Sequence, residues 1–381
     1  MTQYVLLTGS KNNAGDFLIK DRAKDLFSLL KPSVKLIDYD AWEILDESKL
    51  KEINNSKALI LLGGPALQKH MYPKIYRLCN NLNDIKVPII TMGIGWYSKQ
   101  GDWSNTHNYS LSDKTIELLK KIDSTGFKSS VRDYHTLNTL QTLGFKNFIM
   151  TACPAVYNTN FFKKSVETPS IADIKKIGFS LGASFKTSQK MFNQMQDVLL
   201  ALKNNFKDSK IETVFHHSPS EKYLNSPGSN KHFHQMQLKF LEWLKKNDFS
   251  WTDISGSSEN LKKYYQNIDL HVGYRVHAHI FMNSISKPSV LLNEDGRGKA
   301  LKDVIGGVTI DAIESVNESK YIKAAHLMGI NIDDTISPKN ICQDLINTIN
   351  YNLTIGNKFQ QSRFEINRHY KQMENFISNL P

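Results

Sequence analysis

Residues 268–280, Ile-Asp-Leu-His-Val-Gly-Tyr-Arg-Val-His-Ala-His-Ile, join a short apolar run that ends at Gly273 to an arginine and a histidine two positions apart. The pattern predicts a buried strand followed by a helix, which places Arg275 and His277 in the crevice at the carboxyl end of that strand. A guanidinium binds carboxylate or phosphate through two parallel hydrogen bonds, and an imidazole exchanges a proton near neutral pH. This stretch therefore predicts an α/β fold whose site takes an anionic substrate through acid–base chemistry.

Outward from this stretch, the first half of the chain alternates short apolar runs with longer amphipathic segments. The apolar runs predict buried strands at 4–8, 34–39, 58–62, 88–92 and 148–151. The amphipathic segments predict helices at 17–30, 72–82, 113–122 and 133–143. Alternation of this kind indicates a parallel sheet with helices on both faces.

A polar segment at 158–173 without clear periodicity is the predicted linker, and the alternation restarts after it. Strands are predicted at 176–180, 211–216, 270–273, 288–292 and 308–310, and helices at 191–205, 232–247, 259–266, 276–284 and 297–304. Two further helices, at 340–351 and 359–377, have no strand after them. We expect two Rossmann-like domains facing a central cleft, at 1–157 and 174–337, with the helices of 338–381 packing back toward the first domain.

The composition limits the class of protein. A chain of 381 residues with 40% hydrophobic and 22% charged residues is ordinary globular material, long enough for two domains. Its 48 Lys and Arg against 37 Asp and Glu give a net charge of +11, which favours anionic partners or is simply a solvated lysine-rich surface. The lysines are spread along the chain, so we predict no nucleic-acid partner, whereas a peripheral association with an anionic membrane stays open.

The sequence has no clear pattern for a disulfide framework, a signal peptide or a membrane span. The three cysteines are far apart and include no C-x-x-C pair, so the sequence supports neither a disulfide framework nor a zinc site. The first residues lack the charged and apolar regions of a signal peptide, and no apolar run approaches the length of a membrane span. We expect a cytoplasmic location, and the sequence leaves the oligomeric state open.

Glycine-bearing loops follow three of the predicted strands. The loop from Gly9 to Asp16 precedes a helix, and its glycine spacing matches neither a P-loop nor the dinucleotide fingerprint. Gly64 and Gly95 end the third and fourth strands, where glycine lets a ligand approach the backbone. We expect Asn13, Gly15, Asp16, Gly64 and Gly95 to outline one rim of the cleft; alternatively, Asp16 only caps a helix and Gly15 only serves a turn.

Two other positions are candidates for the cleft. Arg132 stands just before a predicted helix and is either an anion contact or half of a surface ion pair with Asp133. His217 follows a predicted strand and either lines the cleft from its loop or is an ordinary loop histidine. His277 and His279 are two apart and do not share a helix face, so we predict no metal site.

The order of these motifs resembles the polysaccharide pyruvyl transferase family over roughly residues 4–305. The resemblance rests on Asn13-Ala-Gly-Asp16, Leu62-Gly-Gly-Pro65, Met92-Gly-Ile-Gly95, Ser130-Val-Arg-Asp133, Cys153-Pro-Ala155, Gly273-Tyr-Arg-Val-His-Ala278 and the segment from Pro288 to Asp295. The sequence departs from the family pattern at Cys153, where an aspartate is common, and after His217, where the usual aspartate is missing.

The resemblance implies a fold like that of GT-B glycosyltransferases and the transfer of a pyruvyl group from phosphoenolpyruvate to a sugar of a cell-surface polysaccharide or its lipid-linked precursor, forming a ketal. It implies that Arg275, the backbone of Val276 and His277 hold the donor, with Arg132 as a further anion contact. We expect His277 to be the acid–base residue, with a pKa near working pH, and an ionised Asp16 to act on the acceptor. No cofactor is expected. The alternatives are a GT-B enzyme that uses a nucleotide sugar and a non-catalytic glycan-binding protein.

Overall fold

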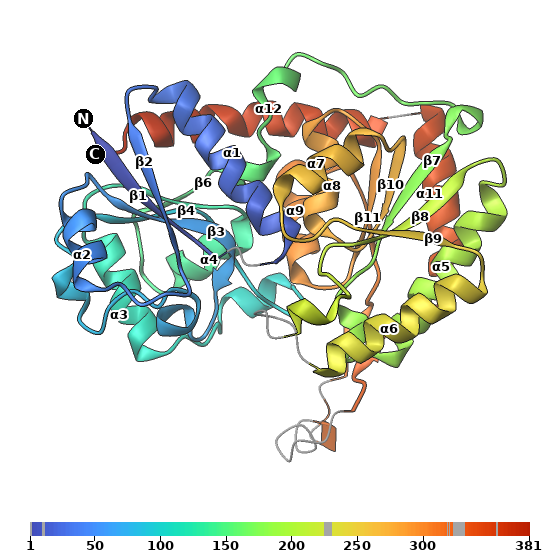
Figure 1. The fold of residues 1–381 in the computed structure, drawn as a ribbon, viewed down its shortest axis with the longest axis horizontal. Helices are drawn as coiled ribbons and strands as arrows, with labels where there is room; N and C mark the ends of the chain where they lie inside the picture. Colours follow the sequence, from blue (N-terminus) through green and yellow to red (C-terminus); the bar gives the residue numbers. More distant parts are fainter. Residues whose placement is uncertain are drawn as a thin grey trace.

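The computed structural model describes residues 2–9, 12–224, 231–317, 319, 321–322, 332–355 and 357–381. Two six-stranded parallel sheets lie side by side, each covered by helices (Figure 1). The first sheet is built from residues 3–150 and the second from residues 176–311. The predicted fold class, α/β with two Rossmann-like units, is confirmed. The domain boundaries themselves stay a prediction.

The N-terminal half has the strand order β2-β1-β3-β4-β5-β6. Its strands are β1 (Gln3–Thr8), β2 (Lys35–Asp40), β3 (Leu59–Leu67), β4 (Ile89–Trp96), β5 (Ser129–Val131) and β6 (Phe148–Met150). Its α-helices are α1 (Ala14–Leu30), α2 (Glu47–Asn54), α3 (Asp113–Asp123) and α4 (Tyr134–Thr142). The strand order reverses between β1 and β3, because β2 lies on one side of β1 and the later strands lie on the other. Parallel sheets bind ligands at the carboxyl ends of the two strands that flank such a reversal.

The C-terminal half has the strand order β12-β11-β10-β7-β8-β9, with its reversal between β7 and β10. Its strands are β7 (Lys176–Ser180), β8 (Lys210–Phe215), β9 (Ser250–Asp253), β10 (Leu270–Gly273), β11 (Ser289–Asn293) and β12 (Val308–Asp311). Its α-helices are α5 (Gln189–Asn205), α6 (Lys231–Lys246), α7 (Ser258–Gln266), α8 (Val276–Ser284) and α9 (Gly296–Ile305). A two-stranded antiparallel ribbon, β13 (Ser315–Val316) and β14 (Thr335–Ile336), follows β12.

Ten strands and most helices were predicted to within a few residues, and the errors have simple causes. The helix predicted at 72–82 is wrong: a π-turn at Met71–Ile75 and a 3-10 turn at Leu82–Asp84 occupy that region. Pro73 lacks the N–H that a helix needs, and Leu78 has a positive φ of 46°. The short strands β5 and β9 and the helix α2 were not predicted, because none has a long apolar run.

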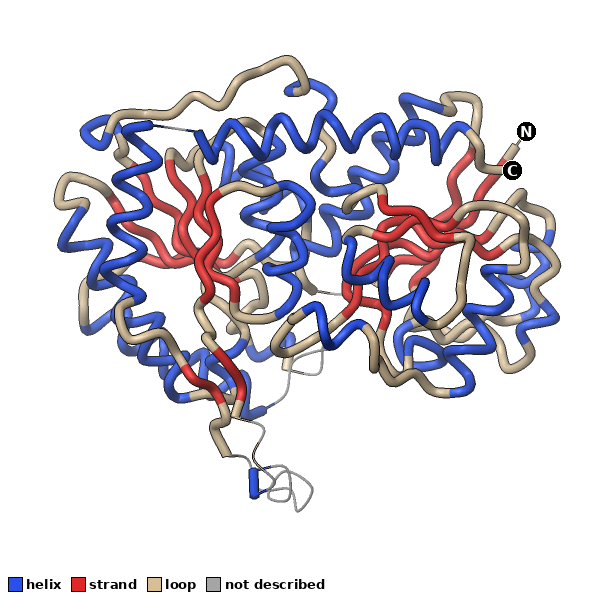
Figure 2. Tube along the Cα trace, turned by 180° about the vertical axis from the view of Figure 1, so that it is seen from behind, coloured by secondary structure: helices blue, strands red, loops and turns tan. Residues whose placement is uncertain are grey.

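The last two helices are α11 (Ile341–Ile355) and α12 (Asn357–Ser378). α12 crosses both halves, as seen from behind in Figure 2, and packs against α1 of the first half and against α8 and α9 of the second. The apolar core of the N-terminal half continues into this region, since Phe281 of α8 and Ile366 of α12 belong to the same buried cluster. The chain end closes on its start, because the Tyr4 hydroxyl donates to the carbonyl of Pro381.

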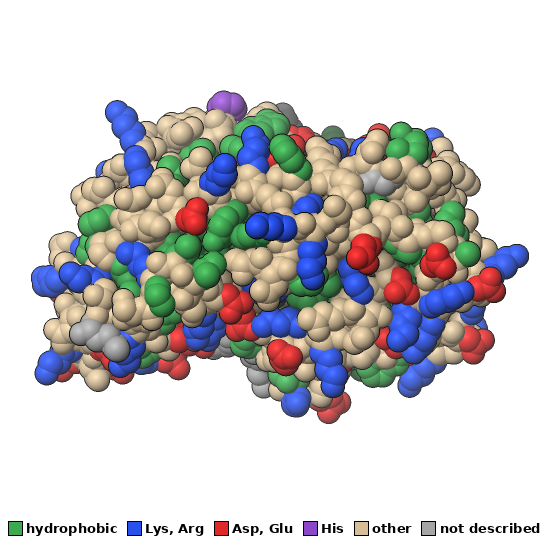
Figure 3. Space-filling model, turned by 90° about the horizontal axis from the view of Figure 1, so that it is seen from above, with side chains coloured by type: hydrophobic (Ala, Val, Ile, Leu, Met, Phe, Trp, Pro, Cys, Tyr) green, Lys and Arg blue, Asp and Glu red, His purple; other side chains and the backbone are tan. Residues whose placement is uncertain are grey.

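Charged side chains of both signs are distributed over the face seen in Figure 3, with basic ones in the majority. This distribution agrees with the spread of lysines along the sequence. Within the described residues, no helix is both long enough and apolar enough to cross a membrane.

Candidate active site

The two halves meet where α1 and α8 begin. Gly15, in the first turn of α1, lies directly against the imidazole of His277, in the first turn of α8. A Cβ atom on Gly15 would stand only 2.5 Å from Cγ of His277, a separation that real Cβ atoms do not show. Glycine at this position therefore makes the close approach of the two halves possible.

Asp16 lies beside this contact, but it is not the helix cap. The Asn13 side chain caps α1 by accepting from the N–H of Gly15 at 3.2 Å, and its amide donates to Oδ2 of Asp16 at 3.1 Å. Burial raises the pKa of Asp16 to about 6, against the opposing effects of the Asn13 hydrogen bond and of nearby arginines. A carboxyl group with this pKa is still mostly ionised at neutral pH, although burial and not the helix N-terminus has the largest effect on it.

A cavity of about 170 Å³ opens next to Asp16, at the reversal between β1 and β3. Gly64, Trp42 and Gln68 line it, together with the ends of both strands. The Trp42 indole N–H donates to the carbonyl of Gly9 at 2.7 Å, which fixes the ring at the cavity wall. Gly64 has a positive φ of 93°, and a Cβ atom on it would lie 4.0 Å from Oδ1 of Asp16.

Arg275 follows β10 at the reversal of the second sheet and is the N-cap of α8. Its Nε donates to the carbonyl of Leu181 at 2.7 Å, its Nη2 donates to that of Gly182 at 3.0 Å, and its backbone N–H donates to the Ser180 hydroxyl at 3.0 Å. These contacts hold the guanidinium in one orientation. Glu294 is the acidic side chain with the largest electrostatic effect on Arg275. Val276 begins α8, where the first backbone N–H groups have no partner inside the helix.

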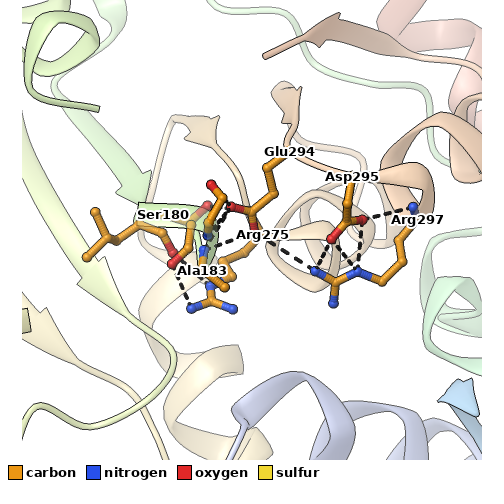
Figure 4. A network of polar contacts seen from close by, with 9 residues as sticks. Ser180, Ala183, Arg275, Glu294, Asp295 and Arg297 are labelled. Atoms are coloured by element: carbon orange, nitrogen blue, oxygen red, sulfur yellow. Dashed lines mark hydrogen bonds and ion pairs between the residues drawn. The ribbon is translucent and has the colours of Figure 1, made fainter. Parts of the chain in front are cut away.

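A second arginine, Arg297, was missed by the sequence reasoning. It lies in the first turn of α9, after β11, and binds Asp295 in a bidentate pair with Nε to Oδ1 at 2.9 Å and Nη2 to Oδ2 at 2.6 Å (Figure 4). Its Nη2 also lies 3.9 Å from Oε1 of Glu294. The sequence Asn-Glu-Asp-Gly-Arg, residues 293–297, lies at a strand-to-helix junction next to β10, and this position could have identified Arg297 from the sequence.

Arg132 approaches from the N-terminal half. A Cβ atom on Gly95 would lie 2.5 Å from Cζ of Arg132, so the missing side chain of Gly95 makes room for the guanidinium. Arg132 Nε lies 3.5 Å from Oδ2 of Asp133, and both side chains are buried, which corrects the alternative of a surface ion pair. Asp133 caps α4, and Nη2 of Arg132 is buried without a hydrogen-bond partner.

The charges of three arginines converge on His277. Burial, followed by the electrostatic effects of Arg132, Arg297 and Arg275, lowers the pKa of His277 to about 3. The imidazole is therefore neutral, which corrects the expected pKa near working pH, and its Nε2 is buried without a partner. Buried polar atoms normally have partners, so Nε2 of His277 and Nη2 of Arg132 are candidate contacts for a ligand.

His217 lies on the same side as Arg275, away from the Asp16 cavity. Burial and the charges of Arg275, Lys186 and Arg297 lower the pKa of His217 to about 3. The pKa of Lys186 is itself lowered by burial and by Arg275. His217 is therefore a neutral side chain near Arg275, Lys186 and Arg297, and it does not line the cavity beside Asp16.

His279 points into the interior of the C-terminal half. Its Nδ1 contacts the hydroxyl of Ser289 at 2.7 Å, which in turn contacts Nδ1 of His271 at 2.7 Å. Nε2 of His271 contacts the Ser180 hydroxyl at 2.8 Å, the group that accepts from the backbone of Arg275. All four of these side chains are fully buried. They form a neutral support beneath the cleft and do not line it.

The thiol of Cys153 and the side chains that could bind a metal add little to the site. Cys153 is buried, and burial raises the pKa of its thiol to about 11, so the thiol keeps its proton. In the part of the chain that the structure describes, no three His, Cys, Asp or Glu side chains are grouped as metal ligands would be. The site is thus a group of arginines around a neutral histidine, with the carboxylate of Asp16 beside it.

The sequence profile of the polysaccharide pyruvyl transferase family matches residues 13–295 and includes every candidate residue above except Arg297. The chain belongs to the polysaccharide pyruvyl transferase family. Membership indicates a transferase that acts on polysaccharide. A search of curated proteins finds no match to this chain.

Solved structures resemble this family member in fold. The Listeria monocytogenes protein assigned as a UDP-N-acetylglucosamine 2-epimerase has a TM-score of 0.50 at 11% identity, over 100% of this chain and 98% of that one. Methanocaldococcus jannaschii UDP-GlcNAc 2-epimerase has a TM-score of 0.46 at 11% identity, over 92% of this chain and 100% of that one. A family 9 glycosyl transferase of Veillonella parvula has a TM-score of 0.41 at 12% identity, over 93% and 98%. The likeness shows the GT-B type of fold and nothing about the substrate.

Proposed function

We propose that this protein transfers the pyruvyl group of phosphoenolpyruvate to two hydroxyls of a sugar in a cell-surface polysaccharide or its lipid-linked precursor, forming a ketal. The observation that carries the proposal is the convergence of Arg132, Arg275 and Arg297 on the neutral His277. Phosphoenolpyruvate is a compact anion with a phosphate and a carboxylate, and planar guanidinium groups suit both. No cofactor is needed, because the arginines can stabilise the charge of the departing phosphate.

The reaction divides its proton transfers between two sides of the cleft. The methylene carbon C3 gains one proton and becomes a methyl group, C2 forms a bond to each of the two sugar oxygens, and the bond from C2 to the phosphate oxygen breaks. The two sugar hydroxyls lose one proton each, so the second proton leaves with the phosphate. Asp16, with a pKa of about 6, is ionised at neutral pH and is the base for a hydroxyl. His277 is the acid for the enol carbon once the negative charge of the donor has raised its pKa.

The acceptor sugar occupies the cavity beside Asp16 in this proposal. Trp42 offers an aromatic wall for the C–H face of a sugar ring, and Gln68 offers an amide. The cavity holds about 170 Å³, enough for part of one sugar residue. It lies at the reversal of one sheet while the arginines lie at the reversal of the other, so the two substrates meet at the Gly15–His277 contact.

We further propose that the enzyme works in the cytoplasm, where phosphoenolpyruvate is made, at the inner face of the membrane when the acceptor is lipid-linked. The net charge of +11 favours an anionic lipid surface. Sedimentation with vesicles of anionic and of neutral lipid at 0.05 and 0.5 M salt tests this part, and equal recovery with both lipids contradicts it.

Thermal unfolding with phosphoenolpyruvate and with UDP- and GDP-sugars separates the proposal from its rivals, because a ligand of the native state raises Tm. Stabilisation by nucleotide sugars alone would favour a glycosyltransferase. The decisive experiment incubates the protein with phosphoenolpyruvate and glycan precursors of the producing organism and follows the mass of the glycan. Release of phosphate with a pyruvylated product supports the proposal, whereas donor binding without any product favours a glycan-binding role.

A further inference from the structure

The loop after β7 forms an anion-binding nest, and a side chain of the protein already fills it. The backbone N–H of Ala183 donates to Oε2 of Glu294 at 2.8 Å, and that of Ser184 donates to the same oxygen at 2.9 Å. The Ser184 hydroxyl adds a third hydrogen bond to it at 2.7 Å. Figure 4 shows Glu294 reaching across from the end of β11 to this loop, between Arg275 and Arg297.

The position of the nest is the one where a parallel sheet ordinarily takes a phosphate. β7 and β10 flank the reversal of the second sheet, and the loop after such a strand can offer backbone N–H groups to an anion. Here these N–H groups donate to Glu294, whose side chain is only 4% exposed. These N–H groups are therefore not free to bind a phosphate while Glu294 accepts from them.

Gly182 accommodates the contact between Glu294 and the loop after β7. A Cβ atom on Gly182 would collide with Oε2 of Glu294, so only glycine lets the carboxylate reach the loop. Arg275 donates to the carbonyl of Gly182, which ties the filled nest directly to the donor-binding arginine. The carboxylate thus meets a built site of three donors and a matched glycine.

We propose that Glu294 determines donor specificity by occupying the nest, so that the cleft accepts one compact anion and rejects a diphosphate. This rests on the proposed function only in taking the arginine side of the cleft as the donor site. A second phosphate placed in the nest would displace Glu294 or stand beside its charge, and like charges at that separation repel strongly. The side chain acts as an internal anion that removes the subsite a nucleotide diphosphate would use.

The test measures binding of inorganic phosphate and of inorganic pyrophosphate to the full-length protein by calorimetry. Glu294→Ala empties the nest and leaves three donors for a second phosphate. We expect its affinity for pyrophosphate, relative to its affinity for phosphate, to rise at least tenfold over the parent protein. We also expect acetate, which replaces the lost carboxylate, to compete with pyrophosphate in this variant.

Asp295→Asn is the matched control, because it removes one negative charge from the adjacent residue, keeps a side chain that can cap α9, and leaves the nest filled. A similar rise in the ratio for Asp295→Asn and Glu294→Ala would show a general effect of charge and overturn the proposal, as would no rise in Glu294→Ala. If Glu294→Ala does not fold, Glu294→Ser, whose side chain is too short to reach the nest, is compared with Asp295→Asn, and an equal ratio again overturns it. Failure of phosphoenolpyruvate to bind the parent protein rejects the proposed function and leaves this comparison intact.

Discussion

Gly15 of α1 and His277 of α8 touch across the two halves of the molecule, with space for a hydrogen atom and not for a methyl group between them. The contact brings the carboxylate of Asp16 and the imidazole into one cleft, although the two residues are 261 positions apart in the sequence. The relative placement of the proposed base, Asp16, and the proposed acid, His277, therefore depends on a single missing side chain. This contact is the basis of the first prediction.

Gly15→Ala should destabilise the protein by about 1–3 kcal/mol, the usual cost of inserting a methyl group into a packed contact. It should also slow the proposed transfer by at least tenfold, because a shift of about 1 Å in the acid–base pair is costly. Urea unfolding of the variant in the parent and His277→Ala backgrounds gives the matched control. Removing the imidazole should relieve most of the loss in stability, and equal losses in both backgrounds would show that the clash lies elsewhere.

Arg275→Lys should raise KM for phosphoenolpyruvate at least tenfold while the protein stays folded. Lysine keeps the charge but cannot donate to the carbonyls of Leu181 and Gly182 and still present two parallel donors to an anion. A charge-assisted hydrogen bond of this kind contributes about 1.5–3 kcal/mol. Steady-state kinetics with varied donor provide the measurement, and an unchanged KM would remove Arg275 from the donor site.

Donor binding should take up a proton on His277. In the empty site burial and the three arginines keep the imidazole neutral, and a bound phosphate and carboxylate reverse that field and raise its pKa. Calorimetric titrations at pH 7 in buffers of different ionisation enthalpy count the protons. His277→Gln should still bind the donor but lose the uptake. It should turn over about 10²–10⁴-fold more slowly at saturating donor; a rate restored by excess donor would show that His277 only binds.

Asp16 should set the acid limb of the pH–rate profile. Its pKa of about 6 means that the carboxylate is charged above pH 6 and becomes protonated as the pH falls below it, so the rate should drop on that side. Asp16→Asn should be slow at every pH and should lose the limb. Retention of full turnover by Asp16→Asn would leave the residue with only its hydrogen bond to Asn13.

His279 should make the protein sensitive to acid without taking part in the chemistry. Burial lowers its pKa from 6.5 to about 3, so between these values the unfolded chain binds a proton that the folded chain does not. The folded state is therefore favoured above pH 6.5 and loses stability as the pH falls toward 3, by about 2 kcal/mol at pH 5 for one such histidine. His279→Gln should reduce the difference in unfolding free energy between pH 7.5 and pH 5 by this amount, and an unchanged difference would assign the sensitivity to other groups.

The sequence alone determined those features that depend on neighbours in the chain. Apolar runs of three to six residues placed ten of the strands, and the junction at Gly273 placed Arg275 and His277 at the start of α8. The order of the glycine-bearing motifs indicated the family. These features can be predicted from local sequence because the periodicity of buried residues and the geometry of strand-to-helix turns depend on residues close together in the chain.

Only the tertiary structure decided what those residues do to one another. It showed that Gly15 packs on His277, that Arg297 completes the cationic group and that Glu294 fills the nest at Ala183. It also showed the direction of the pKa shifts of Asp16 and His277, which depend on burial and on charges brought together from both halves of the chain. Solvent exclusion and electrostatic coupling are properties of distance in space, and spacing along the sequence does not contain them.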